Sequence, residues 1–375
     1  MLKKILLGLV PGILLIGAIF YGCGKAVQEG IITPIVTSNK ISVINVSVSG
    51  NNLSFGLMTL DQNNNVINGI GTANLSGAVY AQNPLAAGIR ATDALTPVAN
   101  LIFNSISGGP SGTHKNLAIA LAIDKSDSMY QDATGATSES KVVTAEAAAT
   151  AFVGVEAADT SSNKAAIINF AESVSIDQPM IDLSATNLST VYDAIKIRTP
   201  FVYGTALYDA IGTGIDAASN EAANLVRAVV VLTDGGNSPT ASIYYHSTTE
   251  VIAAANASNI PVYTVGVFWS TAEADTPSFS GGTWSGDLKA IAKGTTGSEN
   301  NYFQIVAGLT GLTAHSAIIR AAALNNTVNI YQSIAQGLIQ SYTVQASLSN
   351  TLSPGIYYAL IQIQNYGQVV VPIRI

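Results

Sequence analysis

The sequence predicts an α/β fold with a doubly wound, mostly parallel sheet, inserted in or attached to a β-sandwich domain. Three observations indicate this architecture. Continuous apolar runs alternate with helical segments through the middle of the chain, as expected of strands buried on both faces and of their crossover helices. On either side of that region, apolar and polar side chains alternate with a period of two, which is typical of antiparallel strands. The length of 375 residues is sufficient for two ordinary domains.

Residues 115–341 are expected to form the α/β domain. Its first strand, residues 117–123, is apolar throughout, and a helix at 139–156 carries an apolar face. Further strands are predicted at 165–171, 228–233, 262–268 and 302–306, and further helices at 187–197, 206–218, 248–257, 288–293 and 326–340. A hairpin turn is predicted at Gln178-Pro179, after the second strand.

The two flanking regions are predicted to form one β-sandwich. Residues 36–114 are β-rich and end in a Gly- and Pro-containing hinge, and residues 342–375 hold an alternating strand and a hairpin. Two or three strands alone are only marginally stable. We therefore expect the C-terminal strands, 342–375, to complete the N-terminal sheet, with the α/β domain inserted between them.

Composition and charge exclude several classes of function. Hydrophobic residues make up 48% of the chain and charged residues only 10%, so a large core and a neutral polar surface are expected. The formal net charge of -7 argues against a nucleic-acid-binding protein. The single cysteine excludes a disulfide framework and a cysteine-built zinc site.

The N-terminus resembles the signal peptide of bacterial lipoproteins. Lys3 and Lys4 precede an apolar run that ends at Gly22, followed by Cys23, the only cysteine. Residues 1–22 are predicted to be the signal peptide and 23–35 a linker, with Cys23 lipidated. The resemblance implies attachment in the cell envelope, at the outer membrane or cell surface. The alternative is that Cys23 is an ordinary residue in an uncleaved anchor.

Oxygen-bearing side chains follow the predicted strands at three points of the α/β domain. Asp124, Ser126 and Ser128 come at the end of the first strand, Thr205 lies in the loop before a helix, and Asp234 follows the strand 228–233. The carboxyl ends of parallel strands share one edge of a sheet, where ligands bind. Oxygen ligands suit hard divalent cations such as Mg²⁺. The sequence therefore predicts a metal site at this edge.

These residues resemble the metal-ion-dependent adhesion site of the von Willebrand factor type A family, Asp-x-Ser-x-Ser with a distant Thr and a distant Asp. The resemblance implies that Ser126 and Ser128 bind the metal directly, Thr205 directly or through water, and Asp124 and Asp234 largely through water. It also implies an open coordination position for an acidic residue of a protein partner. Asp127 stands where the family usually has Gly.

Other interpretations of the same residues stay open at this stage. Asp-x-Ser-x-Ser also suits a helix cap, and Asp209 is expected to be a structural hydrogen-bonding residue. The loop after residue 268, which holds Glu273, is either a disordered insertion or a segment that shapes partner choice. The three histidines show no metal or hydrolase motif.

The resulting functional prediction is a lipid-anchored envelope protein that binds Mg²⁺ (or Mn²⁺ or Ca²⁺) and, through it, a protein partner in adhesion or assembly. It is expected to bind rather than catalyse. The alternatives are a metal-assisted envelope hydrolase, and a scaffold in which the metal only stabilises the fold.

Overall fold

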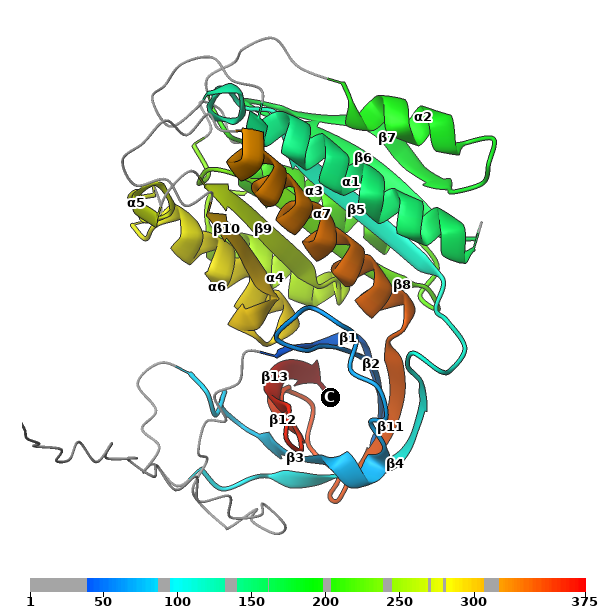
Figure 1. Ribbon diagram of the computed structural model, residues 1–375. Coiled ribbons are helices and arrows are strands. Elements are labelled where there is room, and N and C mark those ends of the chain that lie inside the picture. Colours follow the sequence, from blue (N-terminus) through cyan, green and yellow to red (C-terminus); the bar gives the residue numbers. More distant parts are fainter. Residues whose placement is uncertain are drawn as a thin grey trace, which may run out of the picture.

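A six-stranded sheet and a seven-stranded sheet form the framework of the chain (Figure 1). The computed structural model describes residues 39–86, 95–131, 140–160, 162–197, 204–238, 245–268, 271–278, 281–306 and 317–375. The predicted signal peptide, the linker, Cys23 and His315 lie outside these ranges.

The six-stranded sheet is mostly parallel, as the sequence predicted. Its strand order is β10-β9-β8-β5-β6-β7, and only β7 runs antiparallel to its neighbour. The strands are β5 (Leu117–Asp124), β6 (Lys164–Phe170), β7 (Val174–Asp182), β8 (Val226–Thr233), β9 (Val262–Phe268) and β10 (Tyr302–Val306). Every residue of β5 is buried, because β5 lies at the centre of the sheet and helices cover both faces.

Successive side chains of β5 enter two different cores. Leu121 packs with α1 (Ser140–Asp159), α2 (Leu188–Ile195) and α7 (Ala317–Ile339). Ala120 and Ala122 pack on the opposite face with three other helices, α3 (Leu207–Ser219), α4 (Thr248–Ser258) and α6 (Trp284–Thr296). The sheet is therefore a middle layer between two layers of helices (Figure 1).

Short helices also occur in both parts of the chain, between the longer elements. The four-residue α5 (Thr271–Ala274) follows β9, and the described residues form the 3₁₀ helices η1 (Thr72–Asn74), η2 (Asp127–Tyr130) and η3 (Glu299–Asn301). Of these, η2 and α5 lie next to the candidate site described below.

The predicted hairpin turn at Gln178-Pro179 is wrong. Both residues lie within β7, and the turn comes earlier, where the Ala171 amide donates to the Ser173 carbonyl at 3.1 Å. The pairing register between β6 and β7 shifts around Gln178. Proline is tolerated there because β7 is an edge strand and Pro179 lies at the irregularity in its pairing with β6, where it has no pairing partner.

The seven-stranded sheet joins the two ends of the described chain. Its order is β1-β2-β11-β4-β3-β12-β13, so β11 pairs antiparallel with β2 on one side and β4 on the other. The strands are β1 (Lys40–Ser49), β2 (Asn52–Leu60), β3 (Leu75–Tyr80), β4 (Ala99–Gly108), β11 (Tyr342–Leu348), β12 (Ile356–Ile363) and β13 (Gly367–Arg374).

This sheet differs from the expected β-sandwich in being one continuous, curled sheet. The pairing of β3 with β4 links its two halves, and β1 packs beside β13, so the sheet nearly closes around one apolar core (Figure 1). Strand twist favours such curling, and closure leaves fewer exposed edges than two separate sheets would.

Hydrogen bonds join the seven-stranded sheet to the amino ends of the α/β strands. Asn45 Nδ2, in β1, donates to the carbonyl of Leu225, just before β8, at 2.7 Å. Asn259, shortly before β9, donates through Nδ2 to the carbonyl of Val46 in β1 at 2.5 Å. The Ser42 and Tyr263 hydroxyls lie 2.6 Å apart. The carboxyl ends of β5 and β8 therefore face away from the seven-stranded sheet (Figure 1).

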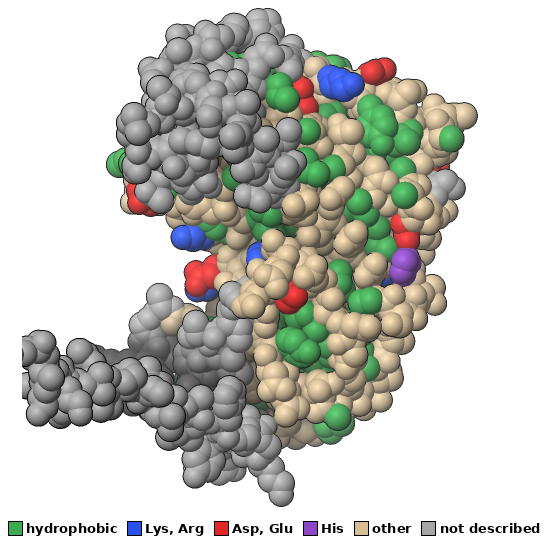
Figure 2. All heavy atoms as spheres, in the orientation of Figure 1, with side chains coloured by type: hydrophobic (Ala, Val, Ile, Leu, Met, Phe, Trp, Pro, Cys, Tyr) green, Lys and Arg blue, Asp and Glu red, His purple; other side chains and the backbone are tan. Residues whose placement is uncertain are grey.

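The face of the described chain drawn in Figure 2 is mostly uncharged. Figure 2 shows few charged side chains on one face, among polar uncharged side chains and backbone. Within the described ranges, no helix is both long enough and apolar enough to cross a membrane.

Candidate metal site

The carboxyl ends of β5 and β8 place two carboxylates side by side. Asp124 is the last residue of β5, and Asp234 directly follows β8, its neighbour in the sheet. Because β6 lies on the other side of β5, the strand order reverses here. Such a reversal leaves a crevice at the carboxyl edge of a doubly wound sheet, which is where ligands bind.

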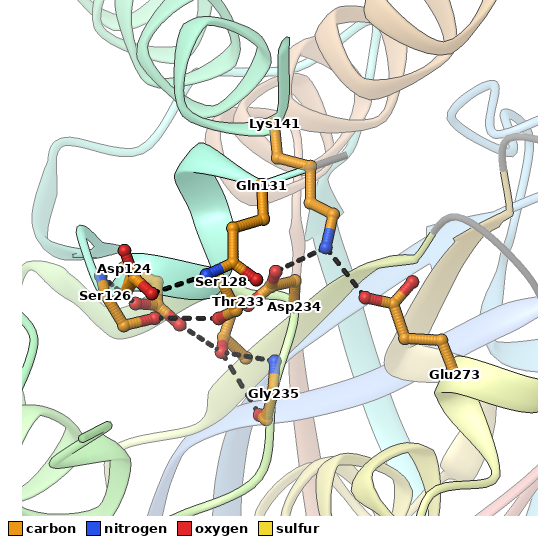
Figure 3. A network of polar contacts seen from close by, with 10 residues as sticks. Asp124, Ser126, Ser128, Gln131, Lys141, Thr233, Asp234, Gly235 and Glu273 are labelled. Atoms are coloured by element: carbon orange, nitrogen blue, oxygen red, sulfur yellow. Dashed lines mark hydrogen bonds and ion pairs between the residues drawn. The ribbon is translucent and has the colours of Figure 1, made fainter. Parts of the chain in front are cut away.

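Asp124 organises the loop that follows it. Its side chain is fully buried; Oδ1 accepts a hydrogen bond from the Ser126 amide at 2.8 Å, and Oδ2 accepts one from Thr233 Oγ1 at 2.5 Å (Figure 3). The bond from Thr233 ties the end of β8 to the end of β5. Thr233 was not among the predicted site residues, although its position next to Asp234 is a signal that could have identified it.

The two serines connect this loop to Asp234. The Ser126 and Ser128 hydroxyl oxygens lie 3.1 Å apart, and Ser128 Oγ donates to Asp234 Oδ1 at 2.7 Å (Figure 3). Ser126 occupies the position before η2, but its side chain makes no capping hydrogen bond there. The local geometry therefore disfavours the helix-cap interpretation of the Asp-x-Ser-x-Ser motif.

Thr205 reaches the same edge through its backbone. Its amide and carbonyl pair with Ser238 at 3.2 and 2.9 Å, which holds the Thr205 loop against the loop after β8. Thr205 Oγ1 lies 4.0 Å from where a Cβ atom on Gly235 would be. Gly204 has a φ of 121°, a conformation that L residues rarely adopt, so a glycine is required before Thr205.

Two nearby acids have other hydrogen-bonding roles. Asp209 Oδ1 accepts from the Tyr245 amide at 2.9 Å, as expected of a structural residue. Asp127, which replaces the usual glycine, accepts from Gln131 Nε2 at 2.5 Å through Oδ2.

Lys141 is a part of the site that the sequence interpretation missed. Its Nζ atom lies 2.5 Å from Asp234 Oδ2 and 2.7 Å from Glu273 Oε1 (Figure 3). Lys141 comes from the first turn of α1 and Glu273 from α5, so the two ion pairs join three elements. A lysine at the start of a helix is usually solvated, and nothing in the local sequence marks this one as buried.

The electrostatics of the site favour a bound cation. Burial, together with the neighbouring charge of Asp234, raises the pKa of Asp124 to about 7. Burial alone would lower the pKa of Lys141, but the charges of Asp234 and Glu273 outweigh it and raise that pKa. Ionising the Asp124 carboxyl beside Asp234 thus costs free energy, which positive charge at this edge offsets.

The donor set and its spacing fit a small divalent ion. Neighbouring oxygen ligands of an octahedral Mg²⁺ lie about 3.0 Å apart, given metal–oxygen distances of about 2.1 Å. The separation of 3.1 Å between the Ser126 and Ser128 hydroxyl oxygens, the two direct ligands that the resemblance implies, is close to that value. The described residues contain no cluster of three or more His, Cys, Asp or Glu side chains arranged for a metal. Hydroxyl oxygens would therefore have to supply part of the coordination.

The histidines do not extend this site within the described ranges. His114 pairs with Asp159 at the C-terminal end of α1, whereas Lys141 lies in the first turn of that helix. His246 precedes α4, where its backbone amide donates to Glu250 at 2.6 Å.

The fold and the site together define a doubly wound α/β domain with a candidate metal-binding edge of oxygen donors. The model of the von Willebrand factor type A domain matches residues 118–310, more than half of the chain, and the protein belongs to that family. A comparison with curated proteins finds no match.

Several solved structures are similar in fold. The pilus adhesin SpaC from Lactobacillus rhamnosus GG matches 89% of this chain and 48% of its own, at 10% identity and a TM-score of 0.41. The von Willebrand domain of the pili tip protein Mfa5 from Porphyromonas gingivalis matches 60% of this chain and 97% of its own, at 14% identity and a TM-score of 0.40.

A third similar structure is proximal thread matrix protein 1 from the mussel byssus, with zinc in its metal-ion-dependent adhesion site. It matches 64% of this chain and 49% of its own, at 16% identity and a TM-score of 0.39. The chain spans about half the length of this protein and of SpaC.

Proposed function

We propose that the protein binds a divalent cation at the edge formed by β5 and β8 and, through it, an acidic group of a protein partner. The observation that carries this proposal is the convergence of five predicted donors at one sheet edge in a von Willebrand type A domain. These donors are Asp124, Ser126, Ser128, Thr205 and Asp234. The role would be adhesion or assembly at the cell envelope.

Each donor has a part in this proposal. Ser126 and Ser128 would bind the ion directly, Thr205 directly or through water, and Asp124 and Asp234 mainly through water. A bound Mg²⁺ (or Mn²⁺ or Ca²⁺) would supply positive charge that attracts a carboxylate from the partner. Because neutral hydroxyls supply the direct ligands, much of that charge would stay available to the partner.

We propose binding rather than catalysis. A metal-assisted hydrolase would need a positioned base that can reach substrate. Asp124 is fully buried, and both of its carboxylate oxygens accept hydrogen bonds from the protein. The scaffold alternative, in which the ion only stabilises the fold, is separated from binding by the next experiment.

Partner capture should depend on the metal. Envelope proteins captured by the purified chain in Mg²⁺ are expected to be lost in a chelator and recovered when Mg²⁺ is added back, while the circular dichroism spectrum stays unchanged. A bait carrying Asp234→Asn serves as the control, because it keeps the side-chain shape but removes the charge. Capture that persists in chelator would contradict the proposal, and unfolding in chelator would indicate the scaffold.

The export proposal makes its own prediction. If Cys23 is the lipidated residue, Cys23→Ser is expected to abolish incorporation of a labelled fatty acid and to release the protein from the membrane fraction. The double variant Cys23→Ser with Ser38→Cys is a matched control, because it restores a cysteine away from the end of the apolar run. Label retained by the single variant, or restored in the double variant, would show that Cys23 is not the specific site of lipidation.

A further inference from the structure

We infer that Lys141 is a tethered cation that competes with the divalent ion for Asp234 and so sets the metal concentration at which the site loads. This inference rests on the proposed metal site and adds a means of regulating it. The Lys141 ammonium lies 2.5 Å from Asp234 Oδ2, while Ser128 uses the other oxygen, Oδ1 (Figure 3). Both oxygens of Asp234 therefore have a donor in the protein itself.

The charges at this edge explain why such a cation is held there. Asp124, Asp234 and Glu273 are three acidic side chains, and Lys141 is the cation seen between two of them. The Lys141 side chain is only 3% exposed, so solvent and salt screen its charge weakly. A divalent ion that enters the site is thus repelled by the positive charge of Lys141, which is already paired with Asp234.

Glu273 is a second charged partner of the Lys141 ammonium. Its Oε1 atom lies 2.7 Å from Lys141 Nζ, and its side chain is 21% exposed, whereas Asp234 is fully buried. If the bond to Asp234 weakens, Lys141 stays paired with Glu273. A buried ammonium that had lost its charged partner would cost much more free energy. Glu273 therefore favours metal loading, and it connects the site to α5, in the segment that follows β9.

Variants of Lys141 and Glu273 should shift metal affinity in opposite directions. Lys141→Gln keeps a hydrogen-bond donor but removes the charge, so Mg²⁺ affinity should rise about tenfold or more, the order expected for one unit charge a few ångströms from a divalent ion. Lys141→Arg keeps the charge and should leave the affinity low. Glu273→Gln should lower the Mg²⁺ affinity several-fold. Without the Glu273 charge, the Lys141 ammonium should pair more strongly with Asp234 and compete better with the divalent ion.

Calorimetric titration with Mg²⁺ is the measurement, and Lys164→Gln is the matched control. Lys164 also carries one positive charge, but it pairs with Glu221 at 2.9 Å, at the start of β6. Its replacement should change the affinity less than threefold. Thermal unfolding without metal adds a second readout, in which Lys141→Gln should melt several degrees below the wild type and gain more from added Mg²⁺.

The outcomes separate this inference from the proposed function. If the wild type binds Mg²⁺ and Lys141→Gln binds it equally or more weakly, the inference is wrong and the metal site stands. If none of the proteins binds a divalent ion, both are wrong. Binding by Lys141→Gln but not by the wild type would support the inference in its strongest form. Should Lys141→Gln fail to fold, Glu273→Gln decides, and an unchanged or higher affinity overturns the inference.

Discussion

Asp234→Ala is expected to weaken Mg²⁺ and Mn²⁺ binding about 10- to 100-fold, the range typical when a partner that orients a metal site is removed. The substitution takes away a buried negative charge and the acceptor of the Ser128 hydroxyl. The fold should largely survive, because Lys141 keeps Glu273 as a partner and the core strand β8 ends at Thr233. Calorimetric titration of the wild type and the variant is the test.

A matched control for this experiment is Asp127→Ala. Asp127 belongs to the same loop and carries the same charge, but its carboxylate accepts from Gln131, and it is partly exposed. Its removal should change metal affinity less than threefold. Partner capture should fall together with metal affinity in Asp234→Ala and remain in Asp127→Ala. Equal Mg²⁺ affinity in the wild type and Asp234→Ala would mean that Asp234 is not part of the site.

Removing residues 342–375 is expected to abolish the ordered structure of the N-terminal strands. The deletion takes out β11, β12 and β13, and β11 lies between β2 and β4. Without it those two strands each lose one of their two hydrogen-bonded neighbours, and the deletion removes about half of the apolar core that they share. Limited proteolysis should then cleave within residues 40–108, whereas residues 115–341, produced alone, should fold by themselves.

A pair of point variants tests the same architecture without shortening the chain. Val344 is fully buried at the centre of β11, and its neighbour Gln345 is exposed on the other face of the sheet. Val344→Asp buries an unpaired carboxylate and should destabilise the seven-stranded sheet by about 3 kcal/mol or more. Gln345→Asp should change stability by about 0.5 kcal/mol or less. Proteolysis that leaves residues 40–108 intact in the deletion variant would count against the insertion of the α/β domain.

The parallel strands of the α/β sheet could be predicted because each of them carries a local signal, whereas the antiparallel β7 was missed. The bounds of β9 and β10 agree with the predicted ranges, and the central strand β5 is apolar up to Ile123 because both of its faces are covered. Element ends were less certain: α6 begins at Trp284, four residues before the predicted start, because the Thr283 side chain accepts from the Gly286 amide and caps it. That cap is a local signal the helical pattern alone did not reveal.

The candidate site was predictable to the extent that strand order implies a shared edge. Asp124 and Asp234 each follow a buried run, and parallel neighbours bring such positions together. The sequence gives no indication, however, of which atoms meet. The bond from Thr233 to Asp124 depends on the register between β5 and β8, which fixes the heights of the two strand ends.

By itself, the sequence determined the alternation of strands and helices and the order of the five candidate oxygen donors, because these depend on residues close together in the chain. Only the tertiary structure decided the curling of the seven-stranded sheet and the pairing of Lys141 with Asp234 and Glu273, partners that lie 93 and 132 residues away. Those features depend on how α1 is rotated and how far strands twist, which is set by packing against distant elements. Periodicity fixes which face of a helix is apolar. It does not fix which distant carboxylates will contact a charged residue in the first turn of that helix, such as Lys141.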